Sequence, residues 1–295
     1  MIFGYDELVN DFKRLADQRL LSHAYLFFGE RELGKFLFAK SLANYLENQK
    51  FEEPEKTLIE TIVVDLEEIE KDSDESRESL GIEKVREVER FLYQTPISSA
   101  YRVAIIRDAE WLTDQAQNAL LKILEEPPKT GLIIAIAKDQ SVFLPTVSSR
   151  FLNVFFPSLP DSSILDFLNK YGIIEQSKVK SIVLRSLGRL GRATRIAKGD
   201  KDREKALEIA KEVLKTKLNP YNLNDLTEKI IVFGEKNPKN IESLLEELIL
   251  ILSEDKVKNL EALKEICNFF VNFNLLTINK RIHIKKLLCQ ITSYS

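Results

Sequence analysis

The pattern whose residue types could do chemistry most directly is a phosphate-binding loop. Gly29, Gly34, Lys35 and Phe36 occupy the fixed positions of the motif Gly-x4-Gly-Lys-Ser/Thr. In this motif the glycines let backbone N–H groups face phosphate oxygens, and the lysine neutralises the β- and γ-phosphates. Phe36 replaces the hydroxyl that ligates Mg²⁺, and a phenyl ring cannot be a metal ligand. The pattern predicts a degenerate nucleotide loop, with an ordinary glycine turn and an exposed lysine as the alternative.

The second half of a nucleotide site is altered as well. In such a site a strand ends in two acidic residues, of which the first organises Mg²⁺ and the second positions the attacking water. Here the apolar residues 103–106 are followed by Arg107 and Asp108, with Glu110 next but one. Arg107 holds the metal-organising position, and a guanidinium cannot coordinate a metal. We expect two independent substitutions to prevent ATP hydrolysis in this chain, while residual binding of nucleotide without metal stays open.

Strands and helices that alternate along the first half of the chain would place these residues at one edge of a sheet. Short apolar runs predict four buried strands, at 24–28, 59–66, 101–109 and 131–137. Helical spacing of apolar residues predicts helices at 1–22, 35–48, 82–94 and 113–127. This alternation predicts an α/β fold with a parallel, doubly wound sheet.

The character of the sequence changes near its middle, where Pro157 and Pro160 interrupt the alternation. From there onward, apolar residues follow a helical period and no strand-like run is evident. Cys267 and Cys289 occupy apolar helical positions, so we expect both in a helical core. Residues 178–217 carry 13 basic and 5 acidic side chains, which fits a surface that faces DNA phosphates or, the interpretation we favour, a solvated helical region.

The overall composition narrows the class of protein. The chain has 295 residues, 44% of them hydrophobic, and a net charge of −3, which excludes a uniformly basic nucleic-acid coat. Two cysteines exclude a disulfide framework and a four-cysteine zinc site. No apolar run approaches the roughly 20 residues of a membrane span, and the N-terminus lacks the organisation of a secretory signal. We therefore expect a cytoplasmic protein with no membrane partner.

Three segments together carry a family resemblance: HAYLFFGERELGK at 23–35, RVAIIRDAEWLTDQAQNALLKILEEPP at 102–128 and FLPTVSSRF at 143–151. In this order they resemble the clamp-loader branch of the AAA+ proteins, and most of all its delta-prime type from bacterial DNA polymerase III. The stretch 118–128 is very specific to that branch. The resemblance extends over residues 1–157, and the helical remainder resembles the family only in length and helical character.

The resemblance implies a chain of three domains that joins a five-subunit ring. They are an AAA+ P-loop α/β domain with a parallel sheet at 1–157, an all-α lid at 158–202 and an all-α collar at 203–295. It also implies motor subunits of the gamma/tau type and a delta subunit as partners. The sliding clamp and primed DNA would be reached through the complex.

One arginine acquires a role through the resemblance. Ser149, Arg150 and Phe151 match the family's Ser-Arg-Cys motif, whose arginine is implied to reach the ATP site of a neighbouring motor subunit. Phosphoryl transfer spreads negative charge over the γ-phosphate oxygens, and a guanidinium supplied by another chain stabilises that charge. Arg150 is thus the one residue expected to do catalytic work, on another chain's ATP. The alternative is a surface arginine with no such role. Phe151, which stands where the family has Cys, is expected to alter the packing behind Arg150 rather than how far Arg150 reaches.

Other positions depart from the family pattern. Many relatives carry a cysteine-rich zinc insertion after the first helix that follows the phosphate loop, but residues 47–57 contain no Cys or His, so we expect no zinc and no metal site. Lys138 stands at the polar position that senses the γ-phosphate in relatives. Arg192 stands at the sensor arginine of the lid, with a basic surface residue at a helix start as the alternative.

Three functions follow from these observations. The leading one is a non-hydrolysing stator of the clamp loader that donates Arg150 and helps to load the sliding clamp. The first alternative is an ATP-hydrolysing motor subunit of the same ring, against which Phe36 and Arg107 count. The second is a P-loop small-molecule kinase, against which the stretch 118–128 and the long helical tail count.

Overall fold

The structure is a computed structural model that describes residues 2–64, 81–170, 172, 176–216, 219–236, 239–253, 259–272 and 280–294. It divides into two compact units, Met1–Ala193 and Thr194–Ser295. The first unit holds the sheet and the predicted site residues, and the second is helical. The finer division into three domains, with bounds at 157 and 202, stays a prediction.

A five-stranded parallel sheet forms the centre of the first unit, in the order β2-β3-β4-β1-β5. The strands are β1 (Ala24–Phe28), β2 (Thr61–Val64), β3 (Arg102–Ile106), β4 (Gly131–Ala137) and β5 (Leu152–Phe155). The first four confirm the strands predicted from apolar runs. The sequence does not reveal β5, because it is a short edge strand whose Leu152 and Phe155 are exposed.

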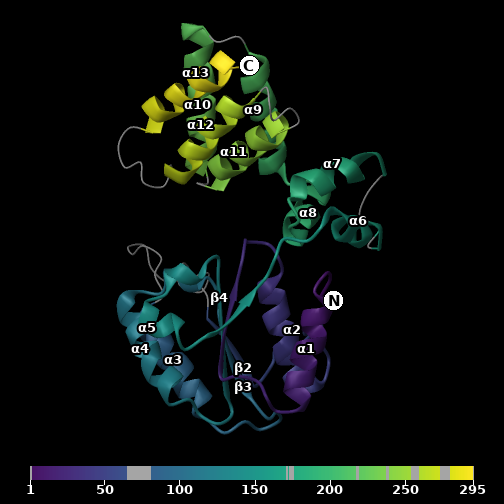
Figure 1. Cartoon of the computed structure of the whole chain (residues 1–295), viewed down its shortest axis with the longest axis vertical. Coiled ribbons are helices and arrows are strands. Elements are labelled where there is room, and N and C mark those ends of the chain that lie inside the picture. Colours follow the sequence, from purple (N-terminus) through teal and green to yellow (C-terminus); the bar gives the residue numbers. More distant parts are fainter. Residues whose placement is uncertain are drawn as a thin grey trace. The chain divides into compact units, whose positions relative to one another are not determined.

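Helices cover both faces of the sheet (Figure 1). One face carries α1 (Asp6–Asp17) and α2 (Lys35–Asn48), and the other carries α3 (Ile82–Leu92) and α4 (Asp114–Glu125). Successive side chains of β1 lie on opposite faces of the sheet. Tyr25 and Phe27 pack against Phe12 of α1, whereas Leu26 joins the aliphatic core beneath α3 and α4.

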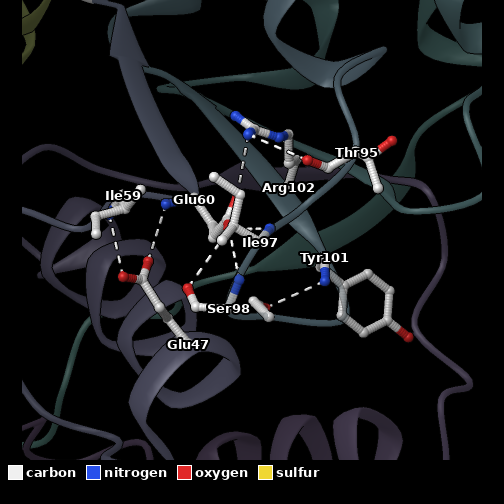
Figure 2. Close-up of polar contacts among 9 residues, drawn as sticks. Glu47, Ile59, Glu60, Thr95, Ile97, Ser98, Tyr101 and Arg102 are labelled. Atoms are coloured by element: carbon white, nitrogen blue, oxygen red, sulfur yellow. Dashed lines mark hydrogen bonds and ion pairs between the residues drawn. The ribbon is translucent and has the colours of Figure 1, made fainter.

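A buried polar cluster fixes the amino-terminal edge of the sheet, where β2 and β3 begin (Figure 2). The Glu60 carboxylate accepts the backbone N–H groups of Ile97 at 2.5 Å and Ser98 at 2.9 Å, and lies 3.4 Å from Arg102 Nη2. Burial raises the pKa of Glu60, but these N–H groups and the guanidinium outweigh it and hold the pKa below its ordinary value. Glu47 in turn accepts the Glu60 N–H at 3.1 Å, so the strand starts are tied to α2.

Three helices follow β5 along the chain. They are α6 (Asp161–Lys170), α7 (Gln176–Ser186) and α8 (Leu190–Ala197). The Leu159 N–H donates to the Gly188 carbonyl at 2.9 Å, which joins the segment before α6 to the turn before α8. The change to helical structure after the proline-rich junction is therefore confirmed.

The second unit is built from five helices in its described residues. They are α9 (Lys201–Lys215), α10 (Pro220–Lys236), α11 (Lys239–Leu252), α12 (Leu260–Asn272) and α13 (Lys280–Tyr294). Their apolar faces form one core, which includes Phe233, Ile266 and Leu288. The prediction that Cys267 and Cys289 lie in this core is wrong, since both are exposed and the preceding Ile266 and Leu288 take the inward positions. Among the described helices, none combines the length and apolarity needed to cross a membrane.

Candidate nucleotide site and arginine loop

The candidate nucleotide site lies where three neighbouring strands end. Residues 29–34 follow β1, Arg107 and Asp108 follow β3, and Lys138 follows β4. Because β3, β4 and β1 are adjacent and parallel, their carboxyl ends meet at one edge of the sheet. The structure thus brings the predicted loop residues together, whereas Arg150 lies on a separate loop.

The two glycines shape the loop as the motif predicts. Gly29 has a φ of +138°, and a Cβ at this position would lie 2.4 Å from the carbonyl oxygen of Phe156. Gly34 has a φ of +91° and precedes α2, and its carbonyl accepts the Phe38 N–H at 2.8 Å. Only glycine adopts such backbone angles without strain. The loop therefore leaves β1 by a tight turn and opens a helix.

Lys35 turns back into its own loop. Its Nζ donates to the carbonyl oxygens of Gly29 and Glu30, the second at 2.6 Å, and the residue is 7% exposed. Burial lowers the pKa of Lys35 to about 8, against the opposing charges of Glu110 and Glu30. The ammonium that would neutralise phosphate oxygens is thus satisfied by main-chain carbonyls of the loop itself.

The two residues that replace the Mg²⁺ ligands contact each other. The guanidinium carbon of Arg107 lies 5.0 Å from the centroid of the Phe36 ring, within the range of a cation–π interaction. Lys40 Nζ lies 5.5 Å from the same ring. Phe36 and Arg107 therefore form one contact between the phosphate loop and the end of β3. That the two substitutions prevent ATP hydrolysis stays a prediction.

Ion pairs join the loop to its surroundings. Arg31 Nη2 lies 3.1 Å from Glu110 Oε1, and Lys138 Nζ lies 3.8 Å from Glu30 Oε1. Arg31 and Glu30 occupy variable positions of the motif, so the sequence pattern did not single them out. The only available signal was their charge beside a motif whose metal ligands are lost.

The beginning of α8 also touches the phosphate loop. The Gly191 N–H donates to the carbonyl oxygen of Glu32 at 3.0 Å, and a Cβ on Gly191 would meet Glu32 Cβ at 3.0 Å. The next residue, Arg192, is completely buried. The helix that carries the predicted sensor arginine is therefore fastened to the loop through a main-chain hydrogen bond.

A P-loop fold implies Mg²⁺ bound with nucleotide, but the residues present do not fit that ion. Mg²⁺ prefers oxygen ligands in octahedral geometry. The two positions that would supply those ligands hold the phenyl ring of Phe36 and the guanidinium of Arg107. Over the described ranges, no group of three or more His, Cys, Asp or Glu side chains is arranged to hold a metal ion.

Arg150 lies between the short helix α5 (Pro145–Ser148) and β5. Its guanidinium donates to the carbonyl oxygen of Thr146 through Nη1 and pairs with Glu125 Oε1 at 2.5 Å through Nη2. The side chain remains 34% exposed. Glu125, the last residue of α4, belongs to the family-specific stretch, but nothing in the sequence showed that it would contact Arg150.

Buried neighbours hold this arginine loop (residues 142–151) against the core. The Phe151 ring packs 5.4 Å from Phe143, and both are buried in the core beneath α4. The amide of Gln117 on α4 donates to the Val142 carbonyl at 3.2 Å and accepts the Leu144 N–H at 2.8 Å. The loop backbone is therefore supported on both sides of α5.

Comparison with known proteins decides the family. The family model described as "DNA polymerase III, delta subunit" matches residues 4–160, more than half of the chain. The chain belongs to this DNA polymerase III family. Its match spans the sheet, the phosphate loop and Arg150, so the family assignment rests on the region that carries both candidate loops.

Two curated relatives are also subunits of DNA polymerase III. The gamma/tau subunit of DNA polymerase III from Mycobacterium bovis is 28% identical over 201 residues, which cover 63% of this chain and 34% of that protein. The delta' subunit from Escherichia coli K12 is 29% identical over 127 residues, covering 43% and 38%. The match thus spans about a third of the gamma/tau relative.

The solved structure is a DNA polymerase III gamma subunit-related protein from Thermotoga maritima, with a TM-score of 0.58 over 97% of this chain and 99% of that one. At 19% identity it shows the fold alone. The predicted α/β fold with a parallel sheet, followed by helical regions, is confirmed.

Proposed function

We propose that this chain is a non-hydrolysing, delta-prime-type subunit of a bacterial clamp loader. It assembles with gamma/tau-type motor subunits and a delta subunit in a five-subunit ring and supplies Arg150 to a neighbouring ATP site. The ring loads the sliding clamp on primed DNA during replication. One observation carries this proposal: Lys35 is enclosed by its own loop, whereas Arg150 is partly exposed on another.

The proposed loss of hydrolysis rests on the contacts that the charged residues of the phosphate loop make. Phosphoryl transfer requires cations that neutralise the γ-phosphate and a metal that bridges the phosphates. Lys35 is bonded to loop carbonyls, and the Phe36–Arg107 contact stands where metal ligands are required. We therefore propose a chain that needs no cofactor, neither Mg²⁺ nor zinc, and in which residual nucleotide binding does not lead to turnover.

The proposed trans role of Arg150 rests on the guanidinium N–H groups that its contacts within this chain do not engage. A guanidinium has five N–H donors, and the contacts with Thr146 and Glu125 engage one on each terminal nitrogen. The other donors of a side chain that is 34% exposed are available to a phosphoryl group of another chain. A trans arginine of this kind supplies on the order of 10³–10⁵ in rate.

The remaining assignments rest on the resemblance. We assign residues 158–202 to the lid and 203–295 to the collar through which the chain enters the ring, and we place the protein in the cytoplasm. Lys138 and Arg192 hold sensor positions, but the pairing of Lys138 with Glu30 and the full burial of Arg192 favour structural roles for both.

A phosphate-release assay on the purified chain with Mg²⁺ and ATP tests the loss of hydrolysis. We expect no turnover above background, with Lys35→Met as the matched variant. Turnover comparable with that of motor subunits, abolished by Lys35→Met, would contradict the proposal.

A motor subunit is the second candidate function. It is favoured by one observation, since the match to the gamma/tau relative covers 63% of the chain and the match to the delta' relative covers 43%. The same phosphate-release assay separates the two, because a motor subunit must hydrolyse ATP in its own loop.

A further inference from the structure

Arg150 is held by an acidic residue from another element, and that contact is the basis of a further inference. We infer that Glu125 is a positioning residue, whose carboxylate orients the Arg150 guanidinium for the neighbouring ATP. The inference rests on the proposed trans role of Arg150. It adds a second residue of this chain to the chemistry carried out on another chain.

Two acceptors on different elements define the orientation of the guanidinium. Glu125 Oε1, at the end of α4, accepts a hydrogen bond from Arg150 Nη2 at 2.5 Å. The Thr146 carbonyl oxygen in α5 accepts a hydrogen bond from Nη1. A planar fork held at both terminal nitrogens cannot rotate about its last bonds without breaking one contact. Its remaining N–H donors then point in a fixed direction, which is what a group acting across a subunit boundary requires.

The base of this contact is rigid. The Thr113 side chain caps α4 by accepting the Ala116 N–H at 3.1 Å. Leu120 and Leu124 are buried beneath the helix. Glu125 therefore extends from a packed helix rather than from a loop, so its carboxylate can serve as a fixed reference point.

The charge of Glu125 is unfavourable where it stands unless a cation faces it. The C-terminus of a helix carries partial negative charge, which destabilises a carboxylate there. Lys122, the cation in the last turn of α4, pairs with Glu89 on α3 at 3.0 Å. Arg150 is the cation that faces Glu125, and this pairing offsets the unfavourable interaction of the carboxylate with the helix end.

Stability does not explain the pair. Both side chains are substantially exposed, Glu125 by 51% and Arg150 by 34%, and exposed ion pairs contribute little to the free energy of unfolding. Loss of the carboxylate should therefore leave the fold intact and act on catalysis alone. That separation makes the role testable.

The experiment uses the complete complex of this chain with gamma/tau-type and delta subunits, with the sliding clamp and primed DNA. The difference in ATPase rate between the wild-type complex and the Arg150→Ala complex gives the share of the total rate that comes from the adjacent ATP site. Glu125→Ala should remove most of that share, a drop in kcat on the order of tenfold at that site with little change in KM for ATP. Glu125→Gln should recover much of it, because the amide oxygen still accepts from Nη2.

Two further variants make the test specific. Glu126→Ala, which removes the adjacent carboxylate, should behave as wild type. In the double variant Glu125→Ala/Arg150→Ala, the rate should equal that of Arg150→Ala alone, since a positioning residue has nothing left to position. Melting temperature and assembly of each variant should match wild type.

The outcomes separate the inference from the proposed function. If Arg150→Ala slows hydrolysis but Glu125→Ala leaves or raises the rate, or if the two losses add, the positioning role is wrong and the trans arginine stands. If Arg150→Ala leaves the adjacent site unaffected, the proposed function fails and the inference falls with it.

Discussion

The phosphate loop and the arginine loop place similar cations in opposite situations. Lys35 and Arg150 both donate to main-chain carbonyls within a few residues of themselves. Lys35 is 7% exposed and its loop is closed by further contacts, whereas the Arg150 side chain is 34% exposed and its terminal nitrogens retain donors. A cation that is enclosed by its own loop is not available to a ligand, whereas a cation that is oriented but open can act on another chain.

The largest effect is expected at Arg150. Arg150→Ala should lower the hydrolysis rate at the adjacent site by on the order of 10³–10⁵, because the developing charge on the phosphoryl oxygens loses its guanidinium. The total rate of the complex should fall less, since several sites contribute. Arg150→Lys should restore little, because an ammonium lacks the planar fork.

The check is ATP hydrolysis and clamp loading in reconstituted complexes, with unfolding of the isolated variants as the control for folding. Stability should change within about 0.5 kcal/mol, as for other surface substitutions. Full activity of the lysine variant would show that charge alone suffices and would remove the contrast between the two loops.

The next effect concerns the pH dependence of stability through Lys35. Its pKa of about 8 in the folded chain lies below the value of 10.5 for an unperturbed lysine, because burial disfavours the charged form. Between these values the unfolded chain binds more protons, so the free energy of unfolding rises with pH, by about 3 kcal/mol at most. This contribution is lost as the pH falls through 8.

Urea unfolding of wild type and Lys35→Met at several pH values between 7.5 and 10 measures this contribution. The difference in unfolding free energy between the two proteins should move in favour of wild type as the pH rises. Parallel pH profiles would indicate that Lys35 is solvated and that the phosphate loop is as open as the arginine loop.

The smallest effect is the coupling between Phe36 and Arg107. A double-mutant cycle with Phe36→Leu and Arg107→Met should show a coupling of about 0.5–1 kcal/mol in the free energy of unfolding, the size of an exposed cation–π contact. Additive losses would mean that the two substitutions closed the nucleotide site separately, as the sequence alone suggests.

The sequence predicts the fold where periodicity is strong. The runs at 24–28 and 131–137 coincide with β1 and β4, and the segment 35–48 coincides with α2. The edge strand β5 is not evident in the sequence because it is only four residues long and its Leu152 and Phe155 are exposed. The prediction for the cysteines of α12 and α13 is wrong because a shift of one position along a helix turns a side chain away from the core.

For the candidate site, the sequence supplies residue types but not their partners. The motif identifies Lys35, Phe36 and Arg107, yet the turn of Lys35 into its own loop depends on main-chain carbonyls that no motif encodes. The contacts between Phe36 and Arg107 and between Glu125 and Arg150 join residues far apart in the chain. Such pairs emerge only once the sheet order and the packing of α4 are known.

The most direct test compares the two cations within one assay. The complete complex is assembled with wild-type chain, with Lys35→Met or with Arg150→Ala, and the rate of clamp loading on primed DNA is measured at saturating ATP. We expect Lys35→Met to load at the wild-type rate and Arg150→Ala to load far more slowly. Slow loading with Lys35→Met and normal loading with Arg150→Ala would show that the chain acts through its own nucleotide loop, and would contradict the trans role of Arg150.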